Sequence, residues 1–135
     1  MDEGKILYLE TSAIVAILKN ETERQEFLDR IEQTKVCVTS IVSAFEASIA
    51  MSGLTGSCSA GLSEVLNFLR LAKAEIQGVG AELLPELAIA RDRYGKGSGH
   101  VAKLNLGDCF SYAVAKQGGM EILYKGDDFA ATDLG

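Results

Sequence analysis

The chain has 135 residues, of which 47% are hydrophobic, and this is the size and apolar content of one domain, which we expect to span residues 1–135. Its net charge of −6 argues against a protein that binds nucleic acid through a bulk positive field. No stretch reaches the roughly 18 to 20 uninterrupted apolar residues of a membrane span, and the acidic start MDEGKILYLE lacks the positive charge of a secretory signal. We therefore expect a cytoplasmic protein.

The chain has three cysteines, Cys37, Cys58 and Cys109. They are odd in number, widely separated, and show no CxxC spacing. We expect reduced and mostly buried thiols rather than a redox or metal site.

The first half of the chain alternates short apolar runs with helical patterns. Strands are predicted at 5–9 and 35–39, and helices at 12–19, 21–34 and 40–53. The helix at 21–34 is amphipathic, because Phe27, Leu28 and Ile31 share one face. The next helix begins after the N-cap candidate Ser40 and ends at Gly53.

The second half continues this alternation. A polar loop is predicted at 55–61, helices at 62–74, 81–95 and 105–119, a weak strand within 75–80, and a last strand at 121–125. The only proline, Pro85, falls in the first turn of its helix, where it is tolerated. Apolar strands that alternate with helices, without a hairpin signal, indicate an α/β three-layer sandwich around a mainly parallel sheet. Such folds bind ligands outside the carboxyl ends of their strands.

Four acidic residues adjoin segments that otherwise have a buried pattern. Glu10 and Asp127 follow the first and last strands, Glu46 lies within the helix at 40–53, and Asp108 lies in the first turn of the helix at 105–119. Singly, each has an ordinary explanation: Glu10 can favour a helix N-terminus, and Glu46 can mark the edge of an apolar stripe. Asp108 can form a capping box with Asn105, and Asp127 can form a turn. Together, at or near strand ends, they predict one shared cleft.

Cations gather in the segment RDRYGKGSGHVAK, residues 91–103. It holds Arg91, Arg93, Lys96 and Lys103 against the single acid Asp92. We expect a local basic loop on an acidic body.

Several carboxylates in one cleft repel each other and lose solvation unless a cation lies between them. Oxygen ligands suit Mg²⁺ or Mn²⁺, and the single histidine, His100, argues against zinc and against a serine or cysteine triad. No phosphate-binding loop of the form G-x-x-x-x-G-K-[ST] is present. A carboxylate site for Mg²⁺ beside a basic loop predicts phosphodiester hydrolysis, in which the metal activates a water and neutralises charge on the phosphate.

The sequence resembles the PIN-domain ribonucleases, and within them the VapC-like toxins of bacterial toxin–antitoxin modules. The resemblance covers nearly the whole chain and is carried by LETSAIVAIL, TSIVSAFEA, ARDRYGKGSGHVAKLNLGDCFSYAVAK and LYKGDDFAATDL. The last two segments are the most specific. The family's fold is a parallel sheet flanked by helices, in agreement with the pattern above.

The resemblance assigns the family's acidic quartet to Glu10, Glu46, Asp108 and Asp127. It implies that Glu10, Asp108 and Asp127 hold the metal, and that Glu46 holds metal-bound water or a second ion. Asp128 is a possible substitute for Asp127.

The resemblance also implies supporting groups and partners. Ser12, beside Thr11, matches the family's small hydroxyl, although simple N-capping also explains it. An RNA substrate, an inhibitory antitoxin and a homodimer are implied, with subunit faces expected on the helices at 21–34 and 62–74. The residues expected to hold RNA phosphates are Arg91, Arg93, Lys96, His100 and Lys103.

Glu10 departs from the family pattern, in which the first acid is nearly always aspartate. The extra methylene moves the carboxylate by about 1.5 Å, and Mg²⁺ tolerates little deviation from octahedral geometry. An alternative function is therefore a catalytically weakened binding module that mainly associates with an antitoxin. A phosphoacceptor receiver domain fits less well, because its acid pair follows the first strand, whereas Asp127 and Asp128 follow the last.

Overall fold

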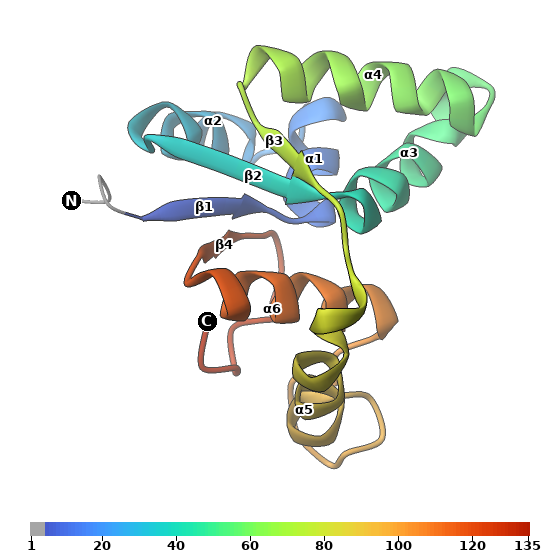
Figure 1. Ribbon diagram of the computed structural model, residues 1–135. Helices are drawn as coiled ribbons and strands as arrows, with labels where there is room; N and C mark the ends of the chain where they lie inside the picture. Colours follow the sequence, from blue (N-terminus) through green and yellow to red (C-terminus); the bar gives the residue numbers. More distant parts are fainter. Residues whose placement is uncertain (1–4) are drawn as a thin grey trace.

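The computed structural model of the protein describes residues 5–135 and contains one sheet of four parallel strands in the order β3-β2-β1-β4 (Figure 1). The strands are β1 (Ile6–Leu9), β2 (Val36–Ser40), β3 (Glu75–Gln77) and β4 (Glu121–Leu123). The helices are α1 (Thr11–Leu18), α2 (Arg24–Gln33), α3 (Ile41–Thr55), α4 (Cys58–Leu71), α5 (Leu84–Tyr94) and α6 (Leu106–Gly118), with a 3-10 turn, η1 (Ala81–Leu83), before α5. Within the described residues no helix is long and apolar enough to cross a membrane.

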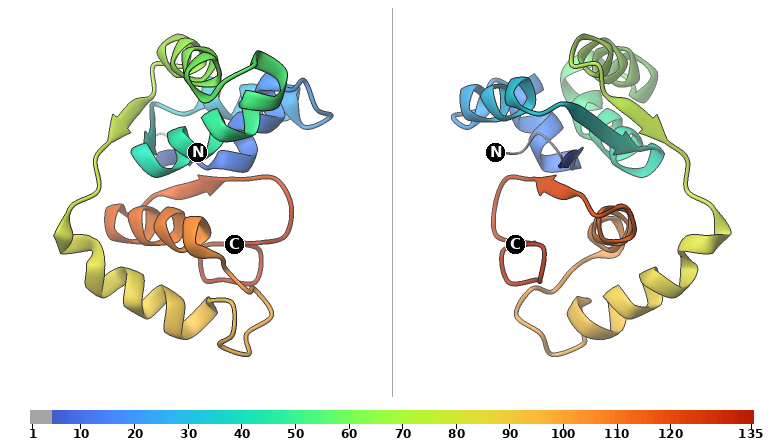
Figure 2. Two further views of the ribbon diagram at one scale, coloured as in Figure 1. Left: turned by 90° about the vertical axis from the view of Figure 1, so that its right-hand side faces the viewer. Right: turned by 60° about the vertical axis from the view of Figure 1, so that its left-hand side comes forward.

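The sheet separates two hydrophobic cores, because side chains alternate between the faces of a strand. Leu7 and Leu9 of β1 pack with α1–α4, whereas Tyr8 packs with α5 and α6 on the other face. Figure 2 shows the two helical layers on opposite sides of the sheet. The predicted three-layer α/β sandwich with a parallel sheet is confirmed.

The boundary predicted between the third and fourth helices is wrong. α3 passes through Gly53 and ends at Thr55, and the next residue, Gly56, has a φ of 98°, the left-handed conformation that closes helices. α4 then begins at Cys58, because the Ser57 hydroxyl accepts a hydrogen bond from the Ala60 amide at 3.0 Å and caps it. Gly61 belongs to α4 and lies against the backbone of α3, where a side chain would collide with the Ser48 carbonyl. The small residues predicted as a loop therefore serve close helix packing.

The helix predicted at 81–95 is correct in outline. It opens with η1 and continues as α5, with Pro85 in the first turn as predicted. The cysteines are free thiols, and Cys37 and Cys109 are buried, as expected.

The carboxyl ends of the strands lie along one edge of the sheet, since all four strands are parallel. The arrowheads of β1 and β2 point to this edge in Figure 1. Glu10 follows β1, α3 follows β2, and the turn at 124–128 follows β4. The fold therefore brings the predicted acidic segments to the same side.

Candidate active site

Glu10 is the junction between β1 and α1. It is 5% exposed, and its backbone amide donates to the Leu123 carbonyl of the neighbouring β4 at 3.1 Å. Its Oε1 accepts from the Ser12 amide at 2.9 Å and from the Ser12 hydroxyl at 2.5 Å, so the side chain caps α1. Burial raises the pKa of Glu10 to about 7; Ser12 opposes this shift, and the charges of Asp108 and Glu46 add to it.

Asp108 lies in the first turn of α6 and is 7% exposed. It forms a capping box: its amide donates to Asn105 Oδ1 at 2.8 Å, and its Oδ2 accepts from the Asn105 amide at 3.1 Å. Burial raises the pKa of Asp108 to about 6; the Asn105 amide opposes this shift, and the charges of Asp128 and Glu46 add to it. The capping box predicted for Asp108 is thus present, and the assignment of the same carboxylate to the site stays a prediction.

Glu46 reaches the site from α3. Its Oε1 accepts from the Thr11 hydroxyl at 2.8 Å, which fixes the carboxylate beside the start of α1. On the other side its carboxylate faces Gly107, where a Cβ would collide with it. Gly107 is a residue that sequence reasoning missed; its only signal was a glycine in the first turn of a helix, directly before the acid.

The turn after β4 is tied to the start of α1. The Lys125 amide donates to Ser12 Oγ at 2.8 Å, so one hydroxyl joins Glu10 to the turn. Asp127 and Asp128 are both exposed, and it is the charge of Asp128 that acts on Asp108. The assignment of Asp127 to the site stays a prediction.

A set of buried hydroxyls lies beneath these acids and was also missed from the sequence. The Tyr8 hydroxyl is within 2.8 Å of the hydroxyls of both Ser40 and Ser43, and Ser43 is 3.2 Å from Ser111. These contacts join β1, the start of α3, and α6. They fix the relative positions of the elements that carry Glu10, Glu46 and Asp108.

The acidic side chains of the candidate site repel one another. Glu10, Glu46, Asp108 and Asp128 take part in none of the ion pairs found among residues 5–135, and no basic side chain opposes the raised pKa of Glu10 or Asp108. Their oxygen donors fit the chemistry of Mg²⁺ or Mn²⁺. In the same part of the chain, no three acidic, histidine or cysteine side chains are so placed that they could hold a metal ion together, so ligation requires side chains to move. Glu10 in particular points to Ser12.

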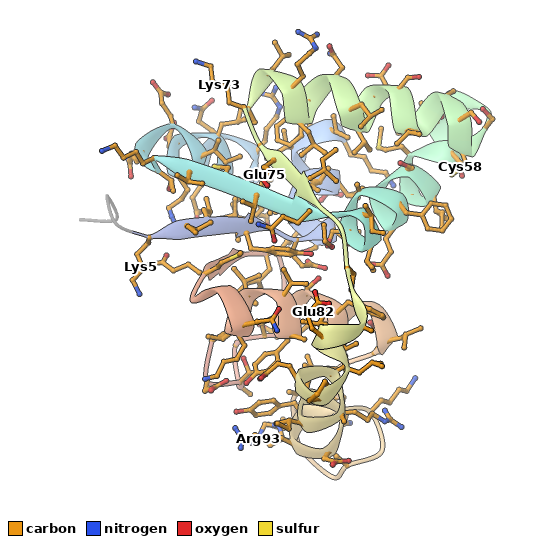
Figure 3. All side chains as sticks on the ribbon, viewed as in Figure 1. Lys5, Cys58, Lys73, Glu75, Glu82 and Arg93 are labelled. Atoms are coloured by element: carbon orange, nitrogen blue, oxygen red, sulfur yellow. The ribbon has the colours of Figure 1, made fainter. Side chains whose placement is uncertain are left out.

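The two arginines of the basic segment face different parts of α6. Burial raises the pKa of Cys109, near the start of α6, and the charge of Arg91 lowers it. Burial likewise raises the pKa of Tyr112, one turn further along, and there the opposing charge is that of Arg93. Arg93 is labelled on α5 in Figure 3. The charge of Arg91 thus acts at the start of α6, and that of Arg93 one turn further along.

The other predicted RNA-binding residues lie in the loop between α5 and α6. Lys96 and Lys103 are exposed, and neither makes an ion pair within the described part of the chain. His100 is held by the loop itself: its Nδ1 accepts from the Ala102 amide at 3.0 Å, and its ring packs edge-on against Tyr94 at 4.8 Å between centroids. Contact of these residues with RNA stays a prediction.

The chain is similar to known proteins in both sequence and fold. The PIN domain family model matches residues 7–134. A VapC ribonuclease of Rhizobium meliloti is 36% identical over 141 residues, covering 95% of this chain and 99% of the relative. Among solved structures, Mycobacterium tuberculosis VapC20, a toxin that cleaves the sarcin–ricin loop, superposes with a TM-score of 0.73 at 17% identity over 94% of this chain and 95% of that one.

A toxin–antitoxin complex from Klebsiella pneumoniae superposes with a TM-score of 0.69 at 16% identity, over 94% of this chain and 92% of that one. At such identities the structural likeness supports the fold alone. The family match and the sequence relative together cover almost the whole chain. The chain therefore belongs to the PIN-domain family.

Proposed function

We propose that this protein is a metal-dependent endoribonuclease that serves as the toxin of a toxin–antitoxin pair. The observation that carries the proposal is the pairing of two buried carboxylates, Glu10 and Asp108, whose pKa values are raised to about 7 and about 6. An acidic cluster with no opposing cation is costly unless it binds one. Support for the substrate class comes from the VapC ribonuclease of Rhizobium meliloti, and support for a protein partner comes from the toxin–antitoxin complex of the same fold.

The residues assigned to the metal are Glu10, Asp108 and one acid of the turn after β4. When bound there, a Mg²⁺ or Mn²⁺ ion would activate a water and stabilise charge on the phosphate. Glu46 is fixed by Thr11 and faces the same space, so its role is to hold a water or a second ion. Among the two acids of the turn, Asp128 is favoured over Asp127 because its charge acts on Asp108.

Glu10 has a second task in this proposal. Its present orientation caps α1 through Ser12, and ligation requires the carboxylate to share or leave that contact. The longer side chain has the rotatable bond that such a movement needs. Ser12 retains its hydrogen bond to Lys125, so it can hold the turn while Glu10 moves.

A protein partner is supported by an apolar stripe on the surface. Ile41, Phe45 and Ile49 lie along one face of α3, and each is at least half exposed. Leu62 and Leu66 of α4 continue it. Contiguous exposed apolar surface marks interaction sites. We assign this surface, rather than α2, to the antitoxin or to a second subunit, because Phe27 and Ile31 of α2 are buried in the core.

The direct test is cleavage of a panel of structured RNAs by the purified protein in Mg²⁺, in Mn²⁺ and in chelator. Asp108→Asn is expected to lose on the order of 100-fold or more in rate. Asp29→Asn on α2 is the matched control, because among residues 5–135 the one side-chain hydrogen bond of that carboxylate is from Gln25 on its own helix. Cleavage that persists in chelator, or that Asp108→Asn retains in full, would contradict the proposal.

A further inference from the structure

A groove runs between α5 and α6, beside the carboxylates. Its volume is about 630 Å³, within the range of small-ligand sites. Leu84 of α5 and Leu106 of α6 line it and are 63% and 79% exposed, and the half-buried ring of Phe110 lies between the helices. Figure 2 shows α5 beside α6 on the face of the sheet opposite α1–α4. Apolar side chains so exposed at a groove mark a binding surface.

The groove is continuous with the candidate active site through the first turn of α6. Asn105 and Cys109 line it, and they flank Asp108 on the same turn. Asn105 Oδ1 accepts from the Asp108 amide, and the Asn105 side-chain NH₂ makes no hydrogen bond among residues 5–135, so it can donate to a ligand. A molecule that occupied the groove would therefore lie next to a phosphate held at Asp108.

A positively charged side chain, Arg91, lies at the side of the groove. Arg91 lines it, is exposed, and makes no ion pair within residues 5–135. Its guanidinium extends toward Gly97, with Nη2 3.6 Å from the place where a Cβ would stand. In a chain of net charge −6, an exposed arginine that lines an apolar groove matches a ligand with an apolar face and a negative charge.

We propose that the α5–α6 groove binds an unpaired nucleobase of the RNA, next to the phosphate that is cleaved. The proposal rests on the ribonuclease function above and adds its substrate contact. Leu84, Leu106 and Phe110 pack on the faces of the base, Asn105 donates to its edge, and Arg91 holds the adjoining phosphate. Unpaired bases pack in this way on aromatic and apolar side chains, whereas paired bases in an RNA helix are inaccessible.

Binding to single-stranded RNA tests this without relying on cleavage. A labelled RNA of about ten nucleotides and mixed sequence is compared with an abasic strand of equal length, by fluorescence anisotropy in Ca²⁺. The parent is expected to bind the base-bearing strand about 10-fold more tightly. Leu106→Ser is expected to remove most of that difference, while Leu54→Ser, equally exposed on α3, keeps it.

Arg91 is tested by salt dependence in the same assay. Arg91→Ala should weaken the binding of both strands. It should also reduce the slope of the logarithm of the binding constant against the logarithm of the salt concentration by about 0.7, the value for one phosphate of a single strand. Arg70→Ala on α4 is the control and should leave the slope unchanged. An unchanged slope for Arg91→Ala would remove that residue from the proposal.

The binding and cleavage assays distinguish failure of the base-binding groove from failure of the nuclease function. If Leu106→Ser binds both strands as the parent does, the groove does not hold a base, and a protein partner becomes its occupant. If the parent binds the base-bearing strand more tightly than the abasic strand but never cleaves RNA, the groove binds a base and the proposed nuclease function is wrong. Asp108→Asn should lose cleavage and keep the discrimination between the two strands.

Discussion

Glu10 combines a structural contact with a large electrostatic cost. The raised pKa means that the folded protein holds a proton on Glu10 that the unfolded chain releases between pH 4.5 and about 7. Stability from this group is therefore fully present below pH 4.5 and is lost as the pH rises through about 7. The shift corresponds to on the order of 3 kcal/mol, since one pKa unit is about 1.4 kcal/mol.

Glu10→Gln tests this cost. Glutamine keeps the oxygen that accepts from Ser12 and removes the charge. In chelator at pH 8, we expect Glu10→Gln to unfold with a free energy higher than that of the parent by on the order of 1 to 3 kcal/mol, and at pH 4.5 to match it. Urea denaturation at both values measures the difference. Equal stability at pH 8 would show that Glu10 is not held in a costly environment.

Asp127 and Asp128 are adjacent, and a matched pair of variants decides between them. Asp128→Asn is expected to lower the pKa of Asp108, because it removes a like charge. It is also expected to reduce the cleavage rate by about 10-fold or more, the effect of losing a group that supports a metal site. Asp127→Asn should have the smaller effect. The pH dependence of the cleavage rate gives both readouts. A larger loss of cleavage rate in Asp127→Asn than in Asp128→Asn would assign Asp127 to the metal, as the sequence predicts.

At the scale of single residues, the acids were predictable and their partners were not. Glu10 and Asp108 stood out because charged residues rarely interrupt buried segments unless they are paired. The contacts of Thr11 with Glu46 and of Lys125 with Ser12 join residues 35 and 113 positions apart, and periodicity carries no information about such pairs.

Among the elements, α6 faces the Glu46 side chain of α3 at Gly107. A Cβ at position 107 would collide with the Glu46 carboxylate, which is the flexible end of its side chain and would have to shift. Gly107→Ala should therefore reduce the cleavage rate on the order of 100-fold through a displaced carboxylate. Alanine's higher helix propensity, about 1 kcal/mol over glycine, should offset part of any loss of stability.

Gly53→Ala is the matched control for Gly107→Ala. Gly53 lies in α3, the helix that carries Glu46, and a Cβ there meets nothing within 4 Å. We expect it to keep its activity and to gain up to about 1 kcal/mol in stability. Cleavage rates and thermal unfolding compare the two variants. Full activity in Gly107→Ala would show that cleavage does not depend on the present position of the Glu46 carboxylate.

The exposed stripe of α3 predicts self-association. Phe45 is 60% exposed at its centre. Removal of an aromatic residue from the centre of an interface costs about 2 kcal/mol or more, so Phe45→Ser should weaken a dimer by about 30-fold. Light scattering across a concentration series measures this, with the exposed Val101→Ser as control. A parent that stays monomeric at every concentration would assign the stripe to the antitoxin alone.

Helix starts were predictable where a cap and an apolar pattern agreed. Ser40 and Asn105 cap α3 and α6 as expected. The start of α4 was missed because small polar residues usually form loops, whereas here Gly61 permits close contact between two helices. That contact depends on a partner helix and has no local signal.

For the whole molecule, alternating strands and helices predicted a parallel sheet but not its order. Placing β1 between β2 and β4 brings Glu10 beside the turn that follows β4, through the hydrogen bond from the Glu10 amide to Leu123. The site is thus a product of topology. Residues from both ends of the chain meet only because the first strand is central.

The buried carboxylates are proposed to bind a divalent cation, and calorimetric titration with Mn²⁺ at pH 6.5 measures this binding. At that pH, Glu10 is mostly protonated and Asp108 partly so, and binding must release protons. Repetition in buffers of different ionisation enthalpy should show release on the order of one proton, and Asp108→Asn should lose the binding. Failure of the parent to bind Mn²⁺, or equal binding by Asp108→Asn, would contradict the account.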